Sequence, residues 1–415
     1  MKTGIYIPGL GESLRQESVI KYATRLMNEM NFNAPDPALR FFTKVENIEY
    51  QKGCRSTKVT IHSGTPENAK PEYVMYDFQY SNLLTENFTN SNVLKKSWLV
   101  FLTVINVLPT TLVRVFVPGE MRNYNLRLRI QSLYAFCIFL LISVFGLSLI
   151  PACVSMLTEA AKLQKGNSFA HLLDIPTWLT RVSAVIISAS TFVFTLAPNY
   201  RTLMTALATE FVCANYYLRI GEKRQKITGA LDCLIEYIAE TDADSEIHLH
   251  TYSFGTIVGM DILFPYGSTV SRRIQQKVKL LVTIGCPFEF LSNYYTQYFK
   301  DRDETMTQVL QKWYNIYSNS DSMSSNFRHG NTKGPAEYTF LNNKNLLPAN
   351  IYYELANVSR FSWVDYVTLY SLKAHQLYWD TDASGASCLL SLYNKMAIDE
   401  FIPAYLEEEQ PAPVI

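Results

Sequence analysis

The pattern of hydrophobic residues predicts a series of short strands separated by helices. Residues 4–7 form an apolar run, and the glycine-rich stretch PGLG at 8–11 ends it, which predicts a buried strand and a tight turn. Residues 278–284, VKLLVTI, are the plainest buried strand. Four more strands are predicted from apolar or alternating runs at 59–62, 74–80, 247–252 and 313–317.

Helices are predicted between these strands. Ser13 is placed to cap a helix that ends near residue 31, residues 202–240 have helical character, and residues 255–263 directly follow a strand. A last helix is predicted over 385–406. Continuously apolar strands that alternate with helices are typical of a mostly parallel sheet covered on both faces. We therefore expect an α/β fold.

Three apolar stretches interrupt this pattern. Residues 130–158 contain no Asp, Glu, Lys or Arg, and about 20 apolar residues are enough to cross a bilayer. Residues 182–200 are a second uncharged run, and residues 98–116 are a third candidate that Pro109 and Arg114 weaken. Each run also fits a buried core helix, and 98–116 fits a helix at the membrane interface as well.

The apolar block lies between strands of the predicted sheet, so it is an insertion and not a terminal anchor. Residues 1–94 are expected to form the N-terminal part of the α/β domain, and residues 204–415 its C-terminal part with the chemically active residues. Residues 95–203 are expected to form a hydrophobic helical insertion, folded as a membrane hairpin.

The composition argues against several classes of protein. Lys and Arg together number 37, and Asp and Glu also number 37, so nothing indicates a nucleic-acid partner. Charged residues make up 18% of the chain, against about 25% in a typical soluble domain. The seven cysteines are scattered without a C-x-x-C pair, which argues against a disulfide framework or a zinc site and favours a reducing compartment.

The stretch HLHTYSFGTIVG at 248–259 places Ser253 between a predicted strand and a predicted helix. This is the context of a nucleophile elbow, G-x-S-x-G, in which a sharp turn exposes the serine. Gly255 occupies the place where a side chain would strike the neighbouring strand, and Gly259 allows the helix to lie close. Thr251 departs from the pattern, which has glycine there.

A serine nucleophile needs a base, and the base needs an orienting carboxylate. In this architecture the chain order is serine, acid, histidine. Asp321 follows the strand at 313–317 in a polar loop, and His375 comes later, so the order is satisfied. His329 is the alternative base and Asp365 the alternative acid.

Other reactive side chains have simpler interpretations. His248 and His250 alternate on the strand before Ser253, which favours a place in the core or at its rim. Cys286 directly follows a buried strand, where a packed thiol is expected more than a nucleophile.

Taken together, these stretches resemble the α/β-hydrolase superfamily, in particular its lipase and esterase branches. HTYSFGTIVGMDIL is similar to the "HSLG" elbow and its helix, although Tyr252 stands in place of the usual His. The other similar stretches are VTIGCP at 282–287 to "TLGSP", WYNIYSNSD to the strand and loop that deliver the acid, AHQLYW to "H-x-x-Y-W", and IPGLGE at 7–12 to the "HG-x-G" oxyanion loop, with Pro8 in place of His.

The resemblance implies roles for these residues. Ser253 would attack an acyl carbonyl, His375 would accept its proton, and Asp321 would orient the imidazole. The oxyanion would be bound by the backbone N–H of Phe254 and by one from the turn at Gly9 and Leu10. No metal and no organic cofactor is needed. The chemistry of the bond, whether ester, thioester or amide, stays open.

Because both parts of the α/β domain share one sheet, the number of membrane crossings between them must be even. Crossings near 133–157 and 182–198 satisfy this, with 98–116 along the surface or packed on the α/β domain. Basic residues favour a cytoplasmic α/β domain: Arg114, Arg122, Arg127, Arg129 and Arg201 lie on its side, against Lys162, Lys165 and Arg181 in the hairpin loop.

The sequence therefore predicts a multi-pass membrane enzyme that cleaves a lipid or an apolar ester. One alternative is a soluble esterase whose apolar helices form a lid or a dimer interface. Another is a catalytically inactive hydrolase fold that acts as a membrane-bound scaffold or binding protein, which the departures at Thr251 and Tyr252 favour.

Overall fold

The structure is a computed structural model of the chain. It describes residues 2–10, 18–34, 39–116, 133, 136–141, 143–144, 147, 177–196, 198–219, 221–330, 332–353, 374–380, 382–385, 387–389 and 392. The strands are β1 (Lys2–Ile7), β2 (Phe41–Gln51), β3 (Cys54–Ser63), β4 (Lys70–Asp77), β5 (Glu246–Tyr252), β6 (Val278–Ile284), β7 (Lys312–Tyr317) and β8 (Ala349–Tyr352).

Helices connect these strands. They are α1 (Val19–Asn33), α2 (Ser81–Thr89), α3 (Val93–Phe116), α5 (Thr177–Leu196), α6 (Pro198–Arg219), α7 (Gly221–Thr241), α8 (Gly255–Leu263), α9 (Arg272–Lys277) and α10 (Phe288–Ser292), with the short 3-10 helices η3 (Thr296–Phe299), η4 (Thr305–Gln308) and η6 (Ala374–Gln376).

An eight-stranded sheet forms the centre of the fold, in the order β2-β3-β4-β1-β5-β6-β7-β8. The six strands from β4 to β8 in this order are parallel, whereas β3 is antiparallel to both β2 and β4. β1 pairs with β5, with Ile5 opposite Leu249, so strands from both ends of the sequence share one sheet. The predicted α/β class with a mostly parallel sheet is confirmed.

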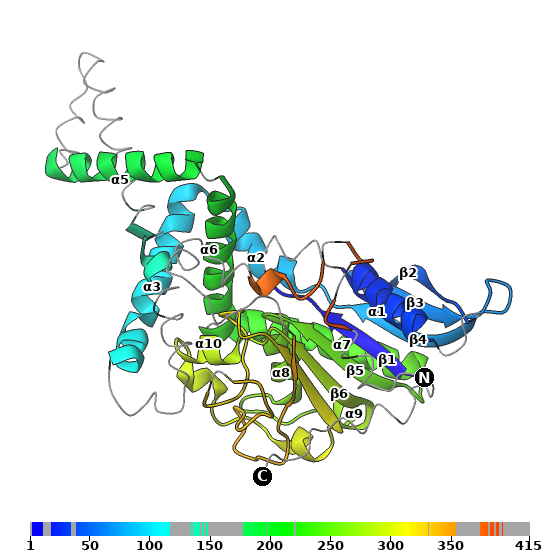
Figure 1. The fold of residues 1–415 in the computed structure, drawn as a ribbon. Coiled ribbons are helices and arrows are strands. Elements are labelled where there is room, and N and C mark those ends of the chain that lie inside the picture. The colour runs from blue at the N-terminus through cyan, green and yellow to red at the C-terminus, as the bar shows by residue number, and fades with distance from the viewer. Residues whose placement is uncertain are drawn as a thin grey trace, which may run out of the picture.

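Helices cover both faces of the sheet (Figure 1). On one face, α1 packs through Val19, Tyr22 and Leu26. On the other face, α7 and α8 bury their apolar residues against the same strands. Because side chains alternate along a strand, Leu249 belongs to the core beneath α7 and α8, and the next residue, His250, faces Tyr22 of α1.

Strong apolar runs predicted their elements well, and polar ones did not. The bounds of α8 and β6 agree with the predictions, and the other predicted strands are present with different bounds. The strand predicted at 59–62 is the longer β3, and the one predicted at 74–80 is β4, which starts earlier and ends at Asp77. β2 and β8 were missed because β2 carries many charged, exposed residues and β8 has only four residues. The predicted helix over 202–240 is two helices, α6 and α7.

The first helix shows how a cap determines where a helix begins. α1 starts at Val19, and the side chain of Ser18 accepts a hydrogen bond from the N–H of Lys21 at 3.4 Å. The predicted capping residue, Ser13, lies outside the described residues, as does most of the helix predicted over 385–406.

Helix α3 is apolar on two opposite faces. Val100, Val104 and Val107 follow helical spacing and are buried, on a helix that packs against α6. On the other side Trp98, Leu102 and Ile105 are 48%, 38% and 45% exposed. Figure 1 shows α3 beside α6, with α5 across their far end. A surface helix in water normally places polar residues on its outer face, so the outer face of α3 is unusual.

The candidate membrane spans differ from those predicted. Among the described residues, one helix, Leu94–Val113, is long and apolar enough to cross a bilayer. It overlaps the third candidate, 98–116, which was expected to lie along the surface or to pack on the α/β domain. The predicted crossing at 182–198 falls mainly in α5, whose sufficiently apolar part, Trp178–Ser188, is shorter. Most of the predicted crossing at 133–157 lies outside the described residues.

Two histidines of β5 lie in a buried chain of hydrogen bonds. The phenol of Tyr22 is 2.9 Å from His250 Nδ1, and the phenol of Tyr73 is 2.9 Å from His250 Nε2 and 3.0 Å from His248 Nδ1. Burial lowers the pKa of His248, and lowers that of His250 well below its usual value, with His248 adding to the effect on His250. As expected from their alternation, both histidines belong to the core.

This network predicts a loss of stability on acidification. Between the lowered folded-state pKa and about 6.5, the unfolded chain binds more protons than the native protein, so lower pH favours unfolding. We expect the free energy of unfolding to fall between pH 7 and pH 5, by up to about 1.4 kcal/mol per pH unit for each histidine. Urea unfolding of the wild type and His250→Gln at each pH measures this, and equal slopes in the two proteins would contradict it.

Candidate active site

Ser253 lies in the sharp turn between β5 and α8. Its φ angle is +51°, in the left-handed region that non-glycine residues rarely adopt. The N–H of Ser253 donates to the carbonyl of Ile284 in β6 at 2.9 Å, and the hydroxyl of Thr256 donates to the carbonyl of Ser253 at 2.7 Å. A strained turn that neighbouring strands hold in place is the geometry of a nucleophile elbow.

Small residues beside the serine make this turn possible. A Cβ at position 255 would overlap the carbonyl oxygens of Ile7 and Pro8, because α8 starts against the end of β1. A Cβ at position 259 would be 2.8 Å from Cγ2 of Thr251. Gly259 thus leaves the space that the threonine side chain occupies, and the Thr251 hydroxyl donates to the carbonyl of Val282 at 2.7 Å. The fold therefore has room for threonine at position 251, where the nucleophile-elbow pattern has glycine.

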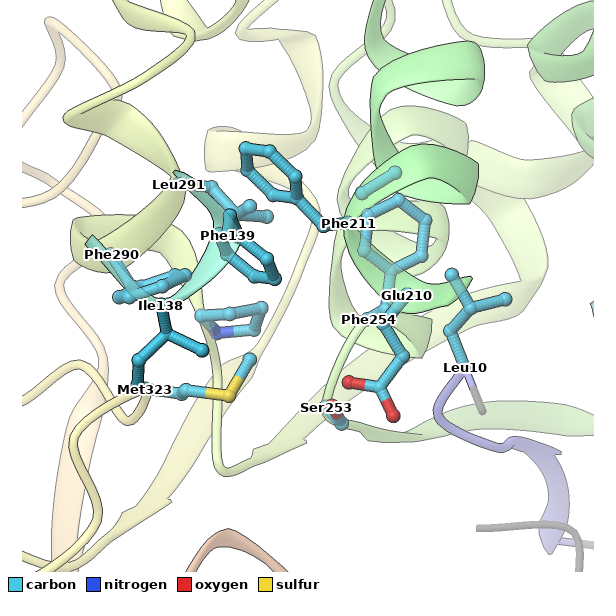
Figure 2. Close-up of a pocket in the computed structure, with 12 residues that line it drawn as sticks. Leu10, Ile138, Phe139, Glu210, Phe211, Ser253, Phe254, Phe290, Leu291 and Met323 are labelled. Atoms are coloured by element: carbon cyan, nitrogen blue, oxygen red, sulfur yellow. The ribbon is translucent and has the colours of Figure 1, made fainter. Parts of the chain in front are cut away.

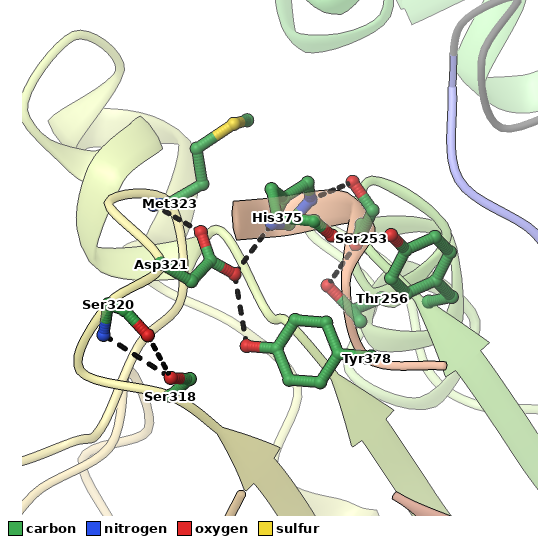
Figure 3. A network of polar contacts seen from close by, with 9 residues as sticks. Ser253, Thr256, Ser318, Ser320, Asp321, Met323, His375 and Tyr378 are labelled. Atoms are coloured by element: carbon green, nitrogen blue, oxygen red, sulfur yellow. Dashed lines mark hydrogen bonds and ion pairs between the residues drawn. The ribbon is translucent and has the colours of Figure 1, made fainter. Parts of the chain in front are cut away.

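Three side chains form one line of hydrogen bonds at this turn (Figure 3). Ser253 Oγ is 2.6 Å from His375 Nε2, and His375 Nδ1 is 2.7 Å from Oδ2 of Asp321. All three residues are buried, with 3%, 4% and 2% of their surface exposed. When Nδ1 carries the proton, the ring donates to the carboxylate and accepts from the hydroxyl, so the imidazole is oriented to remove the serine proton.

The loop after β7 holds Asp321 in this line. Oδ1 of Asp321 accepts from the N–H of Met323 at 2.8 Å, and the phenol of Tyr378 donates to Oδ2 at 3.0 Å. Phe327, further along the same loop, donates its N–H to the buried carboxyl group of Glu289 in α10 at 2.8 Å. The carboxylate of Asp321 is therefore fixed by hydrogen bonds that do not involve the imidazole.

Two opposing effects determine the charge preference of His375. Burial acts to lower its pKa, but the charge and hydrogen bond of Asp321, with a smaller contribution from Glu210, act in the other direction, and the pKa is raised above its usual value. The contact with Asp321 therefore stabilises the imidazolium form of His375. The backbone of His375 is held as well, because its carbonyl accepts from the phenol of Tyr252 at 2.5 Å.

An apolar pocket opens above Ser253 (Figure 2). Its empty volume is about 590 Å³, including the part open to solvent. The lining residues come from every layer of the fold: Leu10, Ile138, Phe139, Glu210, Phe211, Ala214, Ser253, Phe254, Pro287, Phe290, Leu291 and Met323. Such a pocket suits the hydrocarbon part of a ligand.

Two of the three residues expected to bind an oxyanion flank this pocket. Leu10, in the turn after β1, and Phe254, directly after the serine, line it together with Ser253. The N–H groups of Leu10 and Phe254 donate no hydrogen bond to another residue of the described ranges. Gly9, the third residue expected there, precedes Leu10 but is not itself part of the lining. Two backbone donors beside a nucleophile are the components of an oxyanion hole.

The alternative residues lie elsewhere or have other roles. His329 is exposed, with its ring 5.0 Å from that of Tyr338, and is not part of the line at Ser253. The thiol of Cys286 is buried, and burial raises its pKa to about 12, so it stays protonated. Asp365 lies outside the described residues.

Within the described part of the chain, no group of three or more His, Cys, Asp or Glu residues is arranged to hold a metal ion.

Sequence reasoning missed two residues of the site. Tyr378 is in the stretch AHQLYW that delivers the base, and its polar contact with Asp321 emerges only from the folded geometry. Glu210 lies in the middle of a helix that reads as amphipathic and carries no motif, yet it lines the pocket beside Ser253. Its signal in the sequence is weak: it is the one charged residue between Arg201 and Arg219.

Comparison with known proteins gives no match for this chain among family models, curated proteins or solved structures.

The close contact at Gly255 predicts a large effect from a small change. Gly255→Ala places a methyl group against the carbonyl oxygens of Ile7, the last residue of β1, and Pro8, and we expect it to destabilise the protein by about 3 kcal/mol. Gly229→Ala in α7 is the matched control, since its Cβ meets nothing within 4 Å and the helix is expected to gain up to about 1 kcal/mol. Chemical unfolding of both variants measures the difference, and equal stabilities would contradict the described turn.

Proposed function

We propose that the protein is a serine hydrolase that cleaves an ester through Ser253, His375 and Asp321. The observation that carries this proposal is the continuous hydrogen-bond line of 2.6 and 2.7 Å through these three side chains, at a strained turn that opens into a pocket. The sequence resemblance to lipases and esterases of the α/β-hydrolase superfamily supports the same reading, as does the position of the serine after a central parallel strand.

The proposed reaction proceeds in two halves. Ser253 Oγ attacks the carbonyl carbon of the substrate while its proton passes to His375 Nε2, and the carbonyl oxygen becomes negatively charged between the N–H groups of Leu10 and Phe254. The intermediate collapses as the imidazolium returns the proton to the leaving alcohol, and an acyl-serine remains. Water then attacks the acyl group with His375 again as base, which releases the acid and restores the serine.

The substrate proposed is a lipid or another apolar ester. Ten of the twelve described residues that line the pocket are apolar, and the aromatic rings of Phe139 and Phe211 stack at 3.9 Å beside it. Ile138 and Phe139 belong to the apolar insertion, so this segment contributes directly to the pocket. That observation also favours the second candidate, a soluble esterase in which the insertion acts as a lid.

Attachment to a bilayer through residues 95–203 is part of the proposal. Its support is the outer face of α3, where apolar side chains are exposed along helical spacing. The multi-pass arrangement, with the α/β domain in the cytoplasm, stays a prediction from the sequence pattern.

Covalent labelling tests the proposed nucleophile. We expect a fluorophosphonate probe to modify the wild type but not Ser253→Ala, because the probe reacts with an activated serine. An inactive scaffold protein would leave both proteins unlabelled, and labelling of Ser253→Ala would place the nucleophile elsewhere.

Ester turnover tests the other two residues. Replacing Asp321 with Asn leaves His375 without its carboxylate, and we expect kcat to fall about 10⁴-fold with p-nitrophenyl esters. His375→Ala is expected to remove turnover to a similar extent, and the control His329→Ala to change it little, because His329 is exposed and outside the site. Equal effects of the two histidine variants would contradict the assignment.

Charged residues on α3 test the membrane attachment. Each Lys at the centre of a bilayer-embedded helix costs about 2.5–3.5 kcal/mol, so Leu102→Lys with Ile105→Lys is expected to shift the protein from the vesicle fraction to the supernatant in flotation. Ile20→Lys on the exposed side of α1 is the control and should change nothing. A wild type that stays in the supernatant without detergent would favour the soluble esterase with a lid.

A further inference from the structure

Among the described residues, one ionisable side chain lines the pocket above Ser253. Glu210 of α6 lines it, and Figure 2 shows its carboxyl group pointing into the pocket near Ser253. Apart from Glu210 and the serine, every lining residue that the structure describes is apolar. The Glu210 carboxyl group makes no hydrogen bond or ion pair with another residue in the described ranges. An unpartnered carboxyl group in an apolar pocket is costly, so its presence there calls for a functional explanation.

The surroundings of Glu210 favour its neutral form. Burial raises the pKa of this carboxyl group to about 8, with His375 acting to lower it. Among the described residues, the other titratable groups near it are Tyr80 and Cys213. Burial raises the pKa of Tyr80 well above its usual value and that of Cys213 to about 12, so both stay uncharged near pH 8. At pH 7 the carboxylic acid is therefore the favoured form of Glu210.

The same pocket is where negative charge develops in the proposed reaction. A neutral carboxylic acid can donate its O–H to an oxyanion, and enzymes use carboxylic acids kept neutral by an apolar site in this way. A carboxylate in that position has no proton to donate, and its charge repels the oxyanion strongly because little water is present to screen it.

We propose that Glu210 is a further catalytic residue, which acts in its neutral form and donates a hydrogen bond to the substrate carbonyl oxygen as that oxygen becomes negatively charged. The inference rests on the proposed function, because it assigns a role within acyl transfer at Ser253. No bond is made or broken at Glu210, and its proton stays on the carboxyl group throughout.

The role predicts a pH window for activity with two different limits. On the acid side, His375 must lose a proton to act as base, so kcat/KM rises with pH through a pKa that is raised above the usual value for histidine. On the alkaline side, Glu210 must keep its proton, so kcat/KM falls as Glu210 ionises, tenfold per pH unit well above its pKa.

The experiment compares pH profiles of kcat/KM from pH 6 to pH 9.5, with p-nitrophenyl esters, in the wild type, Glu210→Gln and Glu210→Leu. Glu210→Gln keeps a hydrogen-bond donor that cannot ionise, so we expect near wild-type activity at pH 7 and no fall on the alkaline side. Glu210→Leu has no donor and is expected to lose about 100-fold at every pH. Glu236→Gln, on an exposed position of α7, is the control and should keep the wild-type profile.

Two results would overturn the inference: an alkaline fall that is the same in the wild type and Glu210→Gln, or a Glu210→Leu variant as active as Glu210→Gln. If Glu210→Leu does not fold, the comparison of the wild type with Glu210→Gln still decides. Absence of both turnover and fluorophosphonate labelling in the wild type would instead remove the proposed function, and the role of Glu210 with it.

Discussion

The hydrogen bond between Ser253 Oγ and His375 Nε2 joins two segments that are 122 residues apart in sequence. Neither segment determines this contact by itself. The turn that carries Ser253 follows β5, which lies between β1 and β6. The N–H of Ser253 donates to the carbonyl of Ile284 in β6, and Gly255 packs against the carbonyls of Ile7 and Pro8 at the end of β1. Contacts on both sides thus hold the turn in place. The sheet thus converts a locally unfavourable backbone angle at Ser253 into a stable feature.

The line of hydrogen bonds extends from this turn, through His375, to the loop that follows β7. Asp321 follows β7, two strands away from β5, and its carboxylate is held by the N–H of Met323 and the phenol of Tyr378. The carboxyl ends of parallel strands meet at one edge, so residues that follow β1, β5 and β7 converge there. Leu10, Ser253 and Asp321 are those residues, which explains why the hydrogen-bond line and the apolar pocket occupy the same edge.

Much of this arrangement could be predicted from sequence, for a physical reason. Buried parallel strands are continuously apolar, so β5 and β6 stand out, and an elbow directly after β5 brings a serine and two glycines into a short stretch. The edge strand β2 is polar and could not be recognised from hydrophobicity. Glu210 could not be assigned either, because the meaning of a single charge on a helix depends on which side chains the fold places around it.

Residues 95–203 contribute both to the apolar pocket above Ser253 and to the apolar surface of α3. Ile138 and Phe139 line the pocket, while α3 exposes apolar side chains on the face turned away from α6. An enzyme with this arrangement, attached to a bilayer, would have its pocket close to the membrane in which an apolar substrate is dissolved. The same geometry in a soluble protein would make the insertion a lid.

The most direct test of the central claim is the rate at which a fluorophosphonate modifies Ser253 as a function of pH, followed by mass spectrometry of the peptide that carries the adduct. If His375 activates the serine and Asp321 orients the imidazole, the rate rises between pH 5 and pH 8 through a single titration above pH 6.5, and Asp321→Asn loses most of it. A rate that does not depend on His375 or Asp321, or an adduct on another residue, would contradict the account.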